Sequence, residues 1–205
     1  MRSGKKKKKK MRKLSNPILV VLLLFAGFAL ADPPQPPSGS PAVQPAAPPP
    51  PAAQAAATPL QPFTSSDGRF SVFFPGTPTL SSQPMQLKNS ESTTLYEFSA
   101  SADNGNASYI VMYNDYSPDV LADSPQTLLQ RTENGAVAGK TLLGDQAIDL
   151  NGIPGRAYTA TDANGYNYSV HEFLAGTRFY QLIVTTSKGY TATQLDQFMN
   201  SFIIL

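Results

Sequence analysis

The chain of 205 residues contains no cysteine and one histidine, His171. The lack of cysteine excludes disulfides, thiolate nucleophiles and thiolate metal sites, and a single histidine excludes a Cys–His pair or a zinc centre with several histidines. The nucleotide-binding motifs G-x-G-x-x-G and G-x-x-x-x-G-K-[ST] and the nucleophile motif G-x-S-x-G are also missing. We therefore expect no enzyme activity, no cofactor and no metal; a hydrolase that uses only carboxylates is the remaining alternative.

The acidic residues and the histidine that stand out have structural explanations. His171 and Glu172 are consecutive in a predicted strand, so their side chains should point to opposite faces of a sheet and not form a pair. Asp115, Asp119 and Asp123 precede a predicted helix, and we expect them to interact with its positively polarised N-terminus. No D-x-D-x-D-G calcium loop accompanies them.

The first 31 residues have the parts of a secretory signal in the usual order. Residues 1–16 carry nine lysines and arginines, the segment from Ile18 to Ala31 is apolar, and it closes with Ala29-Leu30-Ala31. This segment is shorter than the roughly 20 residues of a membrane-spanning helix. We expect cleavage after Ala31 and export to the periplasm or the medium. The alternative is an uncleaved signal that anchors the protein to the inner membrane.

Residues 32–62 form a spacer that cannot build a core, because they hold 12 of the 19 prolines and eight alanines. We expect this spacer to be disordered or extended. Nine of the 16 basic residues lie before Ala31 and all 14 acidic residues lie after it, so the cleaved chain has seven basic residues against 14 acidic ones, a net charge of −7. Such a chain repels phosphate, and we expect no nucleic-acid partner and no membrane contact except through an uncleaved segment from Ile18 to Ala31.

Residues 63–205 have the size and apolar content of a single α+β domain. Alternating or β-branched segments bounded by turn residues predict strands over 69–74, 80–87, 93–100, 108–113, 140–150, 155–161, 167–174 and 177–186. Pro84 indicates that the second of these is an edge strand. The expected fold is a central antiparallel sheet of about seven strands, flanked by at least two helices.

Two helices are predicted beside this sheet. Ser124 followed by Pro125 is typical of a helix start, and the first helix should end near Gly139. Thr191 and Gln194 have the spacing of a capping box at the start of the second. Its apolar side chains, which we expect to pack on the sheet, are Leu195, Phe198, Met199 and Phe202.

Aromatic residues are concentrated in and beside the last three predicted strands, namely Tyr158, Tyr166, Tyr168, Phe173, Phe179 and Tyr180. Because alternate residues face opposite sides of a sheet, they can supply core packing on one side and an exposed aromatic strip on the other. The candidate interaction residues in such a strip are Tyr166, Tyr168 and Tyr180. Exposed tyrosines suit contact with a protein or a glycan.

Several segments resemble small exported bacterial domains related to the PsbP-like group. They are DGRFSVFFPGTP at 67–78, LNGIPGRAYTATDANGYNY at 150–168, FLAGTRFYQLIVTTSKG at 173–189 and FMNSFII at 198–204. The resemblance covers residues 67–205 and implies an α/β/α sandwich around an antiparallel sheet. PsbP is an extrinsic photosystem II subunit, relatives are assembly factors, and a distant one binds the Ran GTPase. The resemblance implies non-enzymatic protein binding and transfers no catalytic, cofactor or metal residue to this chain.

The leading expectation is therefore a non-enzymatic exported or cell-envelope protein-interaction module, whose partner is an unknown envelope or extracellular protein. The alternative is a small-molecule or glycan-binding domain that uses the Tyr-rich strands. An open apolar pocket lined by Tyr166, Tyr168 or Tyr180 would favour that alternative, and a closed core would contradict it.

Overall fold

The computed structural model describes residues 58–87 and 92–205, so the predicted signal and nearly all of the predicted spacer lie outside the described residues. Seven antiparallel strands form a large sheet. In order across the sheet they are β3 Thr79–Gln86, β4 Ser92–Ala102, β5 Ala107–Asp115, β9 Arg178–Thr186, β8 Asn167–Ala175, β7 Ile153–Thr161 and β6 Thr141–Leu150.

A second, three-stranded sheet and two α-helices complete the described fold. The small sheet contains β1 Leu60–Ser65, β2 Phe70–Pro75 and β10 Ile203–Ile204, and the helices are α1 Pro125–Ala136 and α2 Leu195–Asn200. Short 3₁₀ turns span Asp103–Gly105 and Val120–Ala122. The expected α+β fold with a seven-stranded antiparallel sheet and two helices is confirmed.

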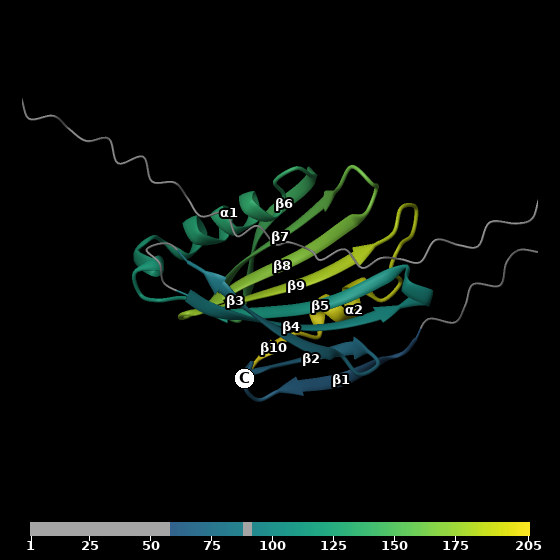
Figure 1. The fold of residues 1–205 in the computed structure, drawn as a ribbon, viewed down its shortest axis with the longest axis horizontal. Coiled ribbons are helices and arrows are strands. Elements are labelled where there is room, and N and C mark those ends of the chain that lie inside the picture. The colour runs from purple at the N-terminus through teal and green to yellow at the C-terminus, as the bar shows by residue number, and fades with distance from the viewer. Residues whose placement is uncertain (1–57, 88–91) are drawn as a thin grey trace, which may run out of the picture.

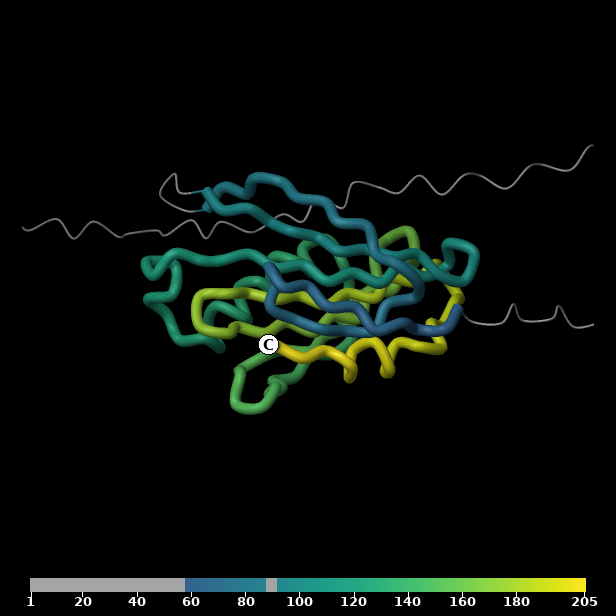
Figure 2. The backbone as a smooth tube through the Cα atoms, turned by 90° about the horizontal axis from the view of Figure 1, so that it is seen from below, coloured from purple at the N-terminus to yellow at the C-terminus, as the bar shows by residue number. Residues whose placement is uncertain are grey.

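The large sheet is covered on both faces. Helix α1 packs on β7 and β8, while the small sheet and α2 lie on the opposite face (Figure 1). Figure 2 shows the β1–β2 hairpin and the C-terminal segment side by side, and β10 pairs with β2 there. The central strands are therefore buried from two sides, and this explains why residues 109–113 are apolar without simple alternation.

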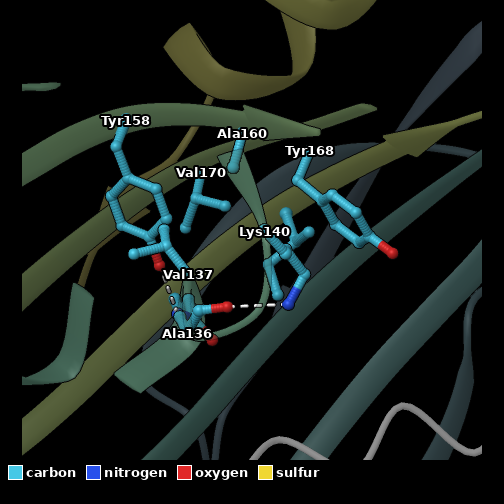
Figure 3. A pocket seen from close by; sticks show the side chains of 9 residues that line it. Ala136, Val137, Lys140, Tyr158, Ala160, Tyr168 and Val170 are labelled. Atoms are coloured by element: carbon cyan, nitrogen blue, oxygen red, sulfur yellow. Dashed lines mark hydrogen bonds between the residues drawn. The ribbon is translucent and has the colours of Figure 1, made fainter. Parts of the chain in front are cut away.

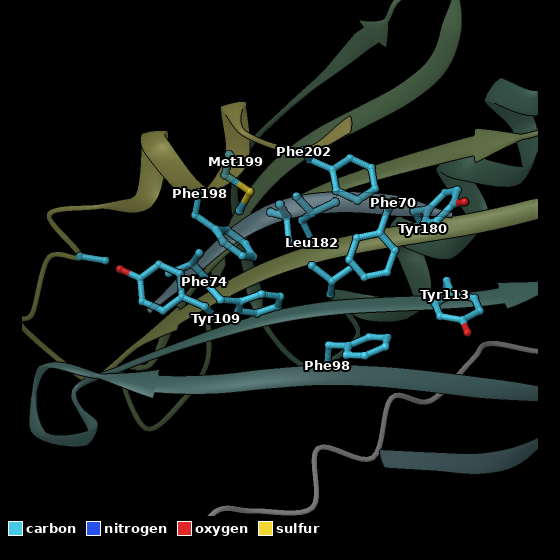
Figure 4. Close-up of a cluster of buried hydrophobic side chains, with 14 of the residues drawn as sticks. Phe70, Phe74, Phe98, Tyr109, Tyr113, Tyr180, Leu182, Phe198, Met199 and Phe202 are labelled. Carbon is cyan, nitrogen blue, oxygen red and sulfur yellow. The ribbon is translucent and has the colours of Figure 1, made fainter. Parts of the chain in front are cut away.

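The larger core lies between the two sheets and contains mainly aromatic side chains (Figure 4). Alternate residues of β5, Tyr109 and Tyr113 among them, face this core, and the residues between them face α1. The centroids of neighbouring rings lie 4.8–6.5 Å apart, as for Phe70 and Phe98 at 5.5 Å. The aromatic residues buried here are Phe70, Phe74, Phe98, Tyr109, Tyr113, Phe173, Tyr180, Phe198 and Phe202.

Each of the predicted strands overlaps an observed strand, but β1 and β10 were not predicted. The first strand begins at Leu60, before the boundary at residue 63 that composition suggested. Pro62 and the neighbouring proline-rich sequence conceal this strand, whose inward residue Phe63 packs beside Phe74 at 5.7 Å between ring centroids. The strand is an edge of the small sheet, a position that tolerates proline.

The helix ends show one correct prediction and one error. Ser124 caps α1, since its Oγ accepts a hydrogen bond from the Thr127 N–H at 3.3 Å. The capping box expected at Thr191 is wrong, because α2 starts later with Gln194 at the N-cap and no side-chain cap bond. The helix is short and Phe202 lies beyond its end, although Phe202 is still buried with Phe198 as expected.

Adjacent phenylalanines of β2 provide a test of the inter-sheet core. Phe74 is 0 % exposed and Phe73 is 39 % exposed. We expect Phe74→Ala to lower the free energy of unfolding by about 3–5 kcal/mol, because it removes a buried ring and leaves a cavity. Phe73→Ala, the matched control, should cost less than about 1 kcal/mol. Urea unfolding followed by circular dichroism measures both, and equal losses would contradict the assigned inter-sheet core.

Candidate functional site

A row of polar side chains crosses the large sheet beneath α1. Gln181 of β9, Glu172 of β8 and Arg156 of β7 are successive cross-strand partners on this face. Helix α1 places Thr132 and Glu133 above them. Both glutamates are buried, Glu172 at 0 % and Glu133 at 1 % exposure. Buried carboxyl groups need partners, and the two obtain them in different ways.

The carboxyl group of Glu172 is surrounded by uncharged hydrogen-bonding groups. Its Oε1 accepts from the Tyr158 hydroxyl at 2.8 Å and from the Gln181 amide at 2.6 Å. Its Oε2 lies 2.6 Å from the Thr132 hydroxyl, which also lies 2.8 Å from the Leu129 carbonyl oxygen. The Thr132 hydroxyl has one proton and cannot donate to both oxygens.

A proton on Glu172 satisfies every member of this network. The protonated Oε2 donates to Thr132, and Thr132 then donates to the Leu129 carbonyl. Burial, the main cause, raises the pKa of Glu172 to about 7, and the charge of Glu133 raises it further against the lowering effect of the hydrogen bonds. Burial beside Glu172 also raises the pKa of Tyr158, so its hydroxyl stays a donor. We conclude that Glu172 is a neutral acid up to about neutral pH.

Glu133, in contrast, has a cationic partner. Its Oε2 accepts from the Arg156 guanidinium and from the Gln130 amide. Arg156 also donates to Asp145 of β6, so one guanidinium joins α1, β7 and β6. An ion pair this deeply buried is costly to break, since loss of either member leaves an uncompensated charge.

The cavity beside this network is small and mostly apolar. It has a volume of about 10 Å³ and is lined by the end of α1, Tyr158, Tyr168 and Gln181 (Figure 3). That is room for at most about one water molecule. Glu172 does not line this cavity and is 0 % exposed.

The structure places the three predicted interaction tyrosines differently. Tyr168 lies half-buried on the α1 face, where its hydroxyl donates to Asp162 at 3.1 Å and the Lys140 ammonium sits 5.1 Å from its ring centroid. Tyr166 is half-buried in the β7–β8 hairpin, where its N–H donates to the Asp162 carboxylate. Tyr180 is 1 % exposed on the opposite face of the sheet.

A common strip of these three tyrosines is therefore not formed, and Tyr180 is corrected from a surface residue to a core residue. Its ring packs against Phe70 and Phe202, and its hydroxyl donates to the Gly68 carbonyl at 2.8 Å. The error arises because the register of β8 with β9 places Tyr168 and Tyr180 on opposite faces of the sheet. The register between two strands cannot be read from their sequences alone.

An open pocket of about 310 Å³ lies where β9 meets the small sheet, lined by Arg69, Asp115, Arg178 and the rim of Tyr180 among others. Arg178 donates to both Asp115 oxygens at 2.8 and 2.7 Å and to the Asp67 carbonyl at 2.7 Å. This hydrogen bonding is the main reason why the pKa of Asp115 lies below its ordinary value. Arg178 thus ties the β1–β2 turn to the large sheet.

The role expected for Asp115 and Asp123 is corrected by their ion pairs. Asp115 pairs with Arg178 and Asp123 with Arg131, and no acidic residue lies in the first turn of α1. The separation of His171 from Glu172 is confirmed, since His171 contacts Phe173 on the inter-sheet side. Burial lowers the pKa of His171, and Asp196 partly opposes this effect.

Sequence reasoning missed the apolar edge formed by β6. Leu142 is 40 % and Leu143 61 % exposed, and a β-bulge lies between Leu142 and Gly144. Leu142 pairs across the strands with Ala160 of β7, which in turn pairs with Tyr168 of β8. This edge therefore adjoins the surface that carries Tyr168. The consecutive leucines were the available signal, because side chains of a strand with one buried face should alternate.

Residues 58–87 and 92–205 contain no cluster of three or more potential metal ligands. Among the helices of this described part, none is long and apolar enough to cross a bilayer. The apolar segment from Ile18 to Ala31 lies outside it.

Comparison with known proteins gives matches to solved structures alone. No family model and no curated protein matches the chain. The chain is similar to cyanobacterial PsbP (CyanoP) from Synechocystis sp. PCC 6803, with 12% identity, coverage of 75% of this chain and 97% of that one, and a TM-score of 0.48. It is also similar to PA94, a protein of unknown function from Pseudomonas aeruginosa, with 10% identity, coverage of 62% and 83%, and a TM-score of 0.29. Neither similarity assigns a function.

The neutral state of Glu172 predicts a pH dependence of stability. In the unfolded chain its carboxyl ionises near the ordinary value of 4.5, and in the folded chain near about 7. Between these values the folded state binds more protons, so this group makes the free energy of unfolding fall as pH rises, by about 3 kcal/mol in total. Glu172→Gln retains a donor and an acceptor and has no proton to lose.

We therefore expect the stability difference between Glu172→Gln and the parent protein to grow in favour of the variant from pH 4.5 to 7. Urea unfolding at a series of pH values measures this difference. Asp119→Asn, at an exposed position, is the control and should follow the parent curve. A Glu172→Gln curve parallel to the parent curve would show that Glu172 is ionised in the folded protein.

Proposed function

We propose that this protein is a non-enzymatic, exported or cell-envelope protein-interaction module that binds its partner through the β6 edge. The β6 edge is the outer side of β6, and Leu142 and Leu143 lie at the N-terminal end of this strand. The observation that carries the proposal is the exposure of these adjacent leucines, 40 % and 61 %, on a strand with no outer neighbour among the described residues. Exposed apolar side chains grouped on a rigid element favour a protein contact.

The use of the notable polar groups supports a non-enzymatic role. Glu172 and Glu133 are enclosed beneath α1, and Asp115 is engaged by Arg178. Catalysis by two carboxyl groups requires both to face a cleft that admits substrate. Glu172 and Glu133, at 0 % and 1 % exposure, line neither this cavity of about 10 Å³ nor the open pocket near Tyr180.

The N-terminal sequence supports the exported location. A basic segment, an apolar segment and Ala29-Leu30-Ala31 precede the proline-rich spacer. Cleavage after Ala31 gives a free periplasmic or secreted protein, and retention of the segment gives a protein tethered to the inner membrane. The resemblance of residues 67–205 to PsbP-like domains agrees with protein binding in either location.

A small-molecule or glycan-binding domain is the second candidate. It is favoured by one observation, the open pocket of about 310 Å³ near Tyr180. The ring of Tyr180 is buried, so the polar groups of this pocket belong mainly to Arg69, Arg178, Asp115 and Thr177. Saccharide titrations that shift the nuclear magnetic resonance signals of these arginines would favour this candidate over a protein-interaction module.

Site-specific photo-crosslinking in the source cells tests the proposed function. A photoreactive residue at Leu143 should give one reproducible adduct with an envelope or extracellular protein, because Leu143 projects from the proposed contact. The same residue at Leu80, which is 55 % exposed on the opposite edge strand β3, is the matched control and should not give that adduct. Equal adducts at both positions, or none at Leu143, would contradict the proposal. Cell fractionation and the mature N-terminus test export in the same cells.

A further inference from the structure

The two edges of the large sheet differ in how they are protected from pairing with another chain. Edge strands expose unpaired backbone N–H and C=O groups, and proteins protect them with proline, lysine, bulges or short length. Strand β3 carries Pro84 in its interior. Strand β6 is ten residues long and contains no proline, lysine or arginine. Its single bulge lies near its start and leaves residues 144–150 in regular register with β7.

The side chains of β6 leave the edge accessible. Eight of its ten residues are exposed. Helix α1 does not cover it, because the contacts of Thr132 with Glu172 and of Glu133 with Arg156 hold the helix over β7 and β8. In the described part of the chain no strand pairs with the outer side of β6.

The charges along residues 144–150 favour a basic partner. Asp145 and Asp149 lie on the same face of β6, since their cross-strand partners are Tyr158 and Pro154. Arg156 and Glu133 complete the nearby charges, three carboxylates against one guanidinium. Lys140 lies before the strand, where its ammonium donates to the Ala136 carbonyl at 2.7 Å. The acidic sequence beyond Ala31 also disfavours a second copy of this chain as the occupant.

We infer that the β6 edge accepts an extended segment of a partner protein as an eighth strand, and that this segment combines apolar residues with basic ones. Backbone hydrogen bonds along residues 144–150 supply the pairing, Leu142 and Leu143 contact apolar residues, and Asp145 and Asp149 attract basic ones. This inference rests on the proposed function and specifies the chemistry of its partner.

The test uses the full chain and capped ten-residue peptides, with binding measured by fluorescence anisotropy at low salt. An alternating Val/Lys peptide should bind. A Val/Glu peptide should bind at least about tenfold more weakly, because its charge is repelled by the aspartates of β6. A Val/Lys peptide with N-methylated amides should lose a similar amount of affinity, because its backbone cannot donate hydrogen bonds. Equal binding of the N-methylated and unmodified peptides, or of the Val/Glu and Val/Lys peptides, would overturn the inference.

Matched variants locate the binding on one edge. Leu143→Lys adds a protective charge to β6 and should weaken the binding of the Val/Lys peptide about tenfold. Leu80→Lys on β3 should leave this binding unchanged. Unchanged far-ultraviolet circular dichroism confirms that each variant is folded. Equal effects of both variants, or dimerisation of the parent protein that Leu143→Lys abolishes, would overturn the assignment. A cross-linked partner at Leu143 without binding of any peptide would keep the interaction function and reject strand addition.

Discussion

The contact between α1 and the large sheet is centred on a buried carboxyl group, that of Glu172. Glu172 lies in the middle of the large sheet, and its hydrogen-bonding partners come from β7, β9 and α1. Because the Thr132 hydroxyl has one proton, it can bond to both Glu172 and the Leu129 carbonyl only when Glu172 itself carries a proton. This network and the Glu133–Arg156 ion pair together fix the helix over β7 and β8. The exposed state of β6, and the binding function proposed for it, follow from this placement.

The opposite face achieves order without a disulfide by combining aromatic packing with a few directed bonds. In β9, the Tyr180 hydroxyl donates a hydrogen bond to the Gly68 carbonyl, and the Arg178 guanidinium donates one to the Asp67 carbonyl. Arg178 also forms an ion pair with Asp115 of β5. These bonds attach the β1–β2 turn to the large sheet at one end of the aromatic core. The open pocket at this end is lined by Arg178 and Asp115, which already pair with each other. We therefore prefer the β6 edge to this pocket as the functional site.

Local sequence patterns predict the strands of the large sheet because hairpin turns and alternating residues are short-range signals. The turn at Asn151 and Gly152, with φ of 53° and 87°, illustrates this. Strand β1 and the environment of Tyr180 depend on distant partners and could not be predicted in this way. Glu172 is the clearest example, because its partner Thr132 lies 40 residues away in the chain. Only the folded structure reveals that an acidic residue in a strand is a proton-bearing anchor.

The protonation of Glu172 in the folded protein is the most direct test of this account. The carbon-13 chemical shift of its carboxyl group, followed by nuclear magnetic resonance as pH is raised, reports this state for the single residue. The account predicts the shift of a protonated acid at pH 5 and a transition near about 7. A transition near the ordinary value of 4.5 would show an ionised group at neutral pH and would contradict the neutral network beneath α1.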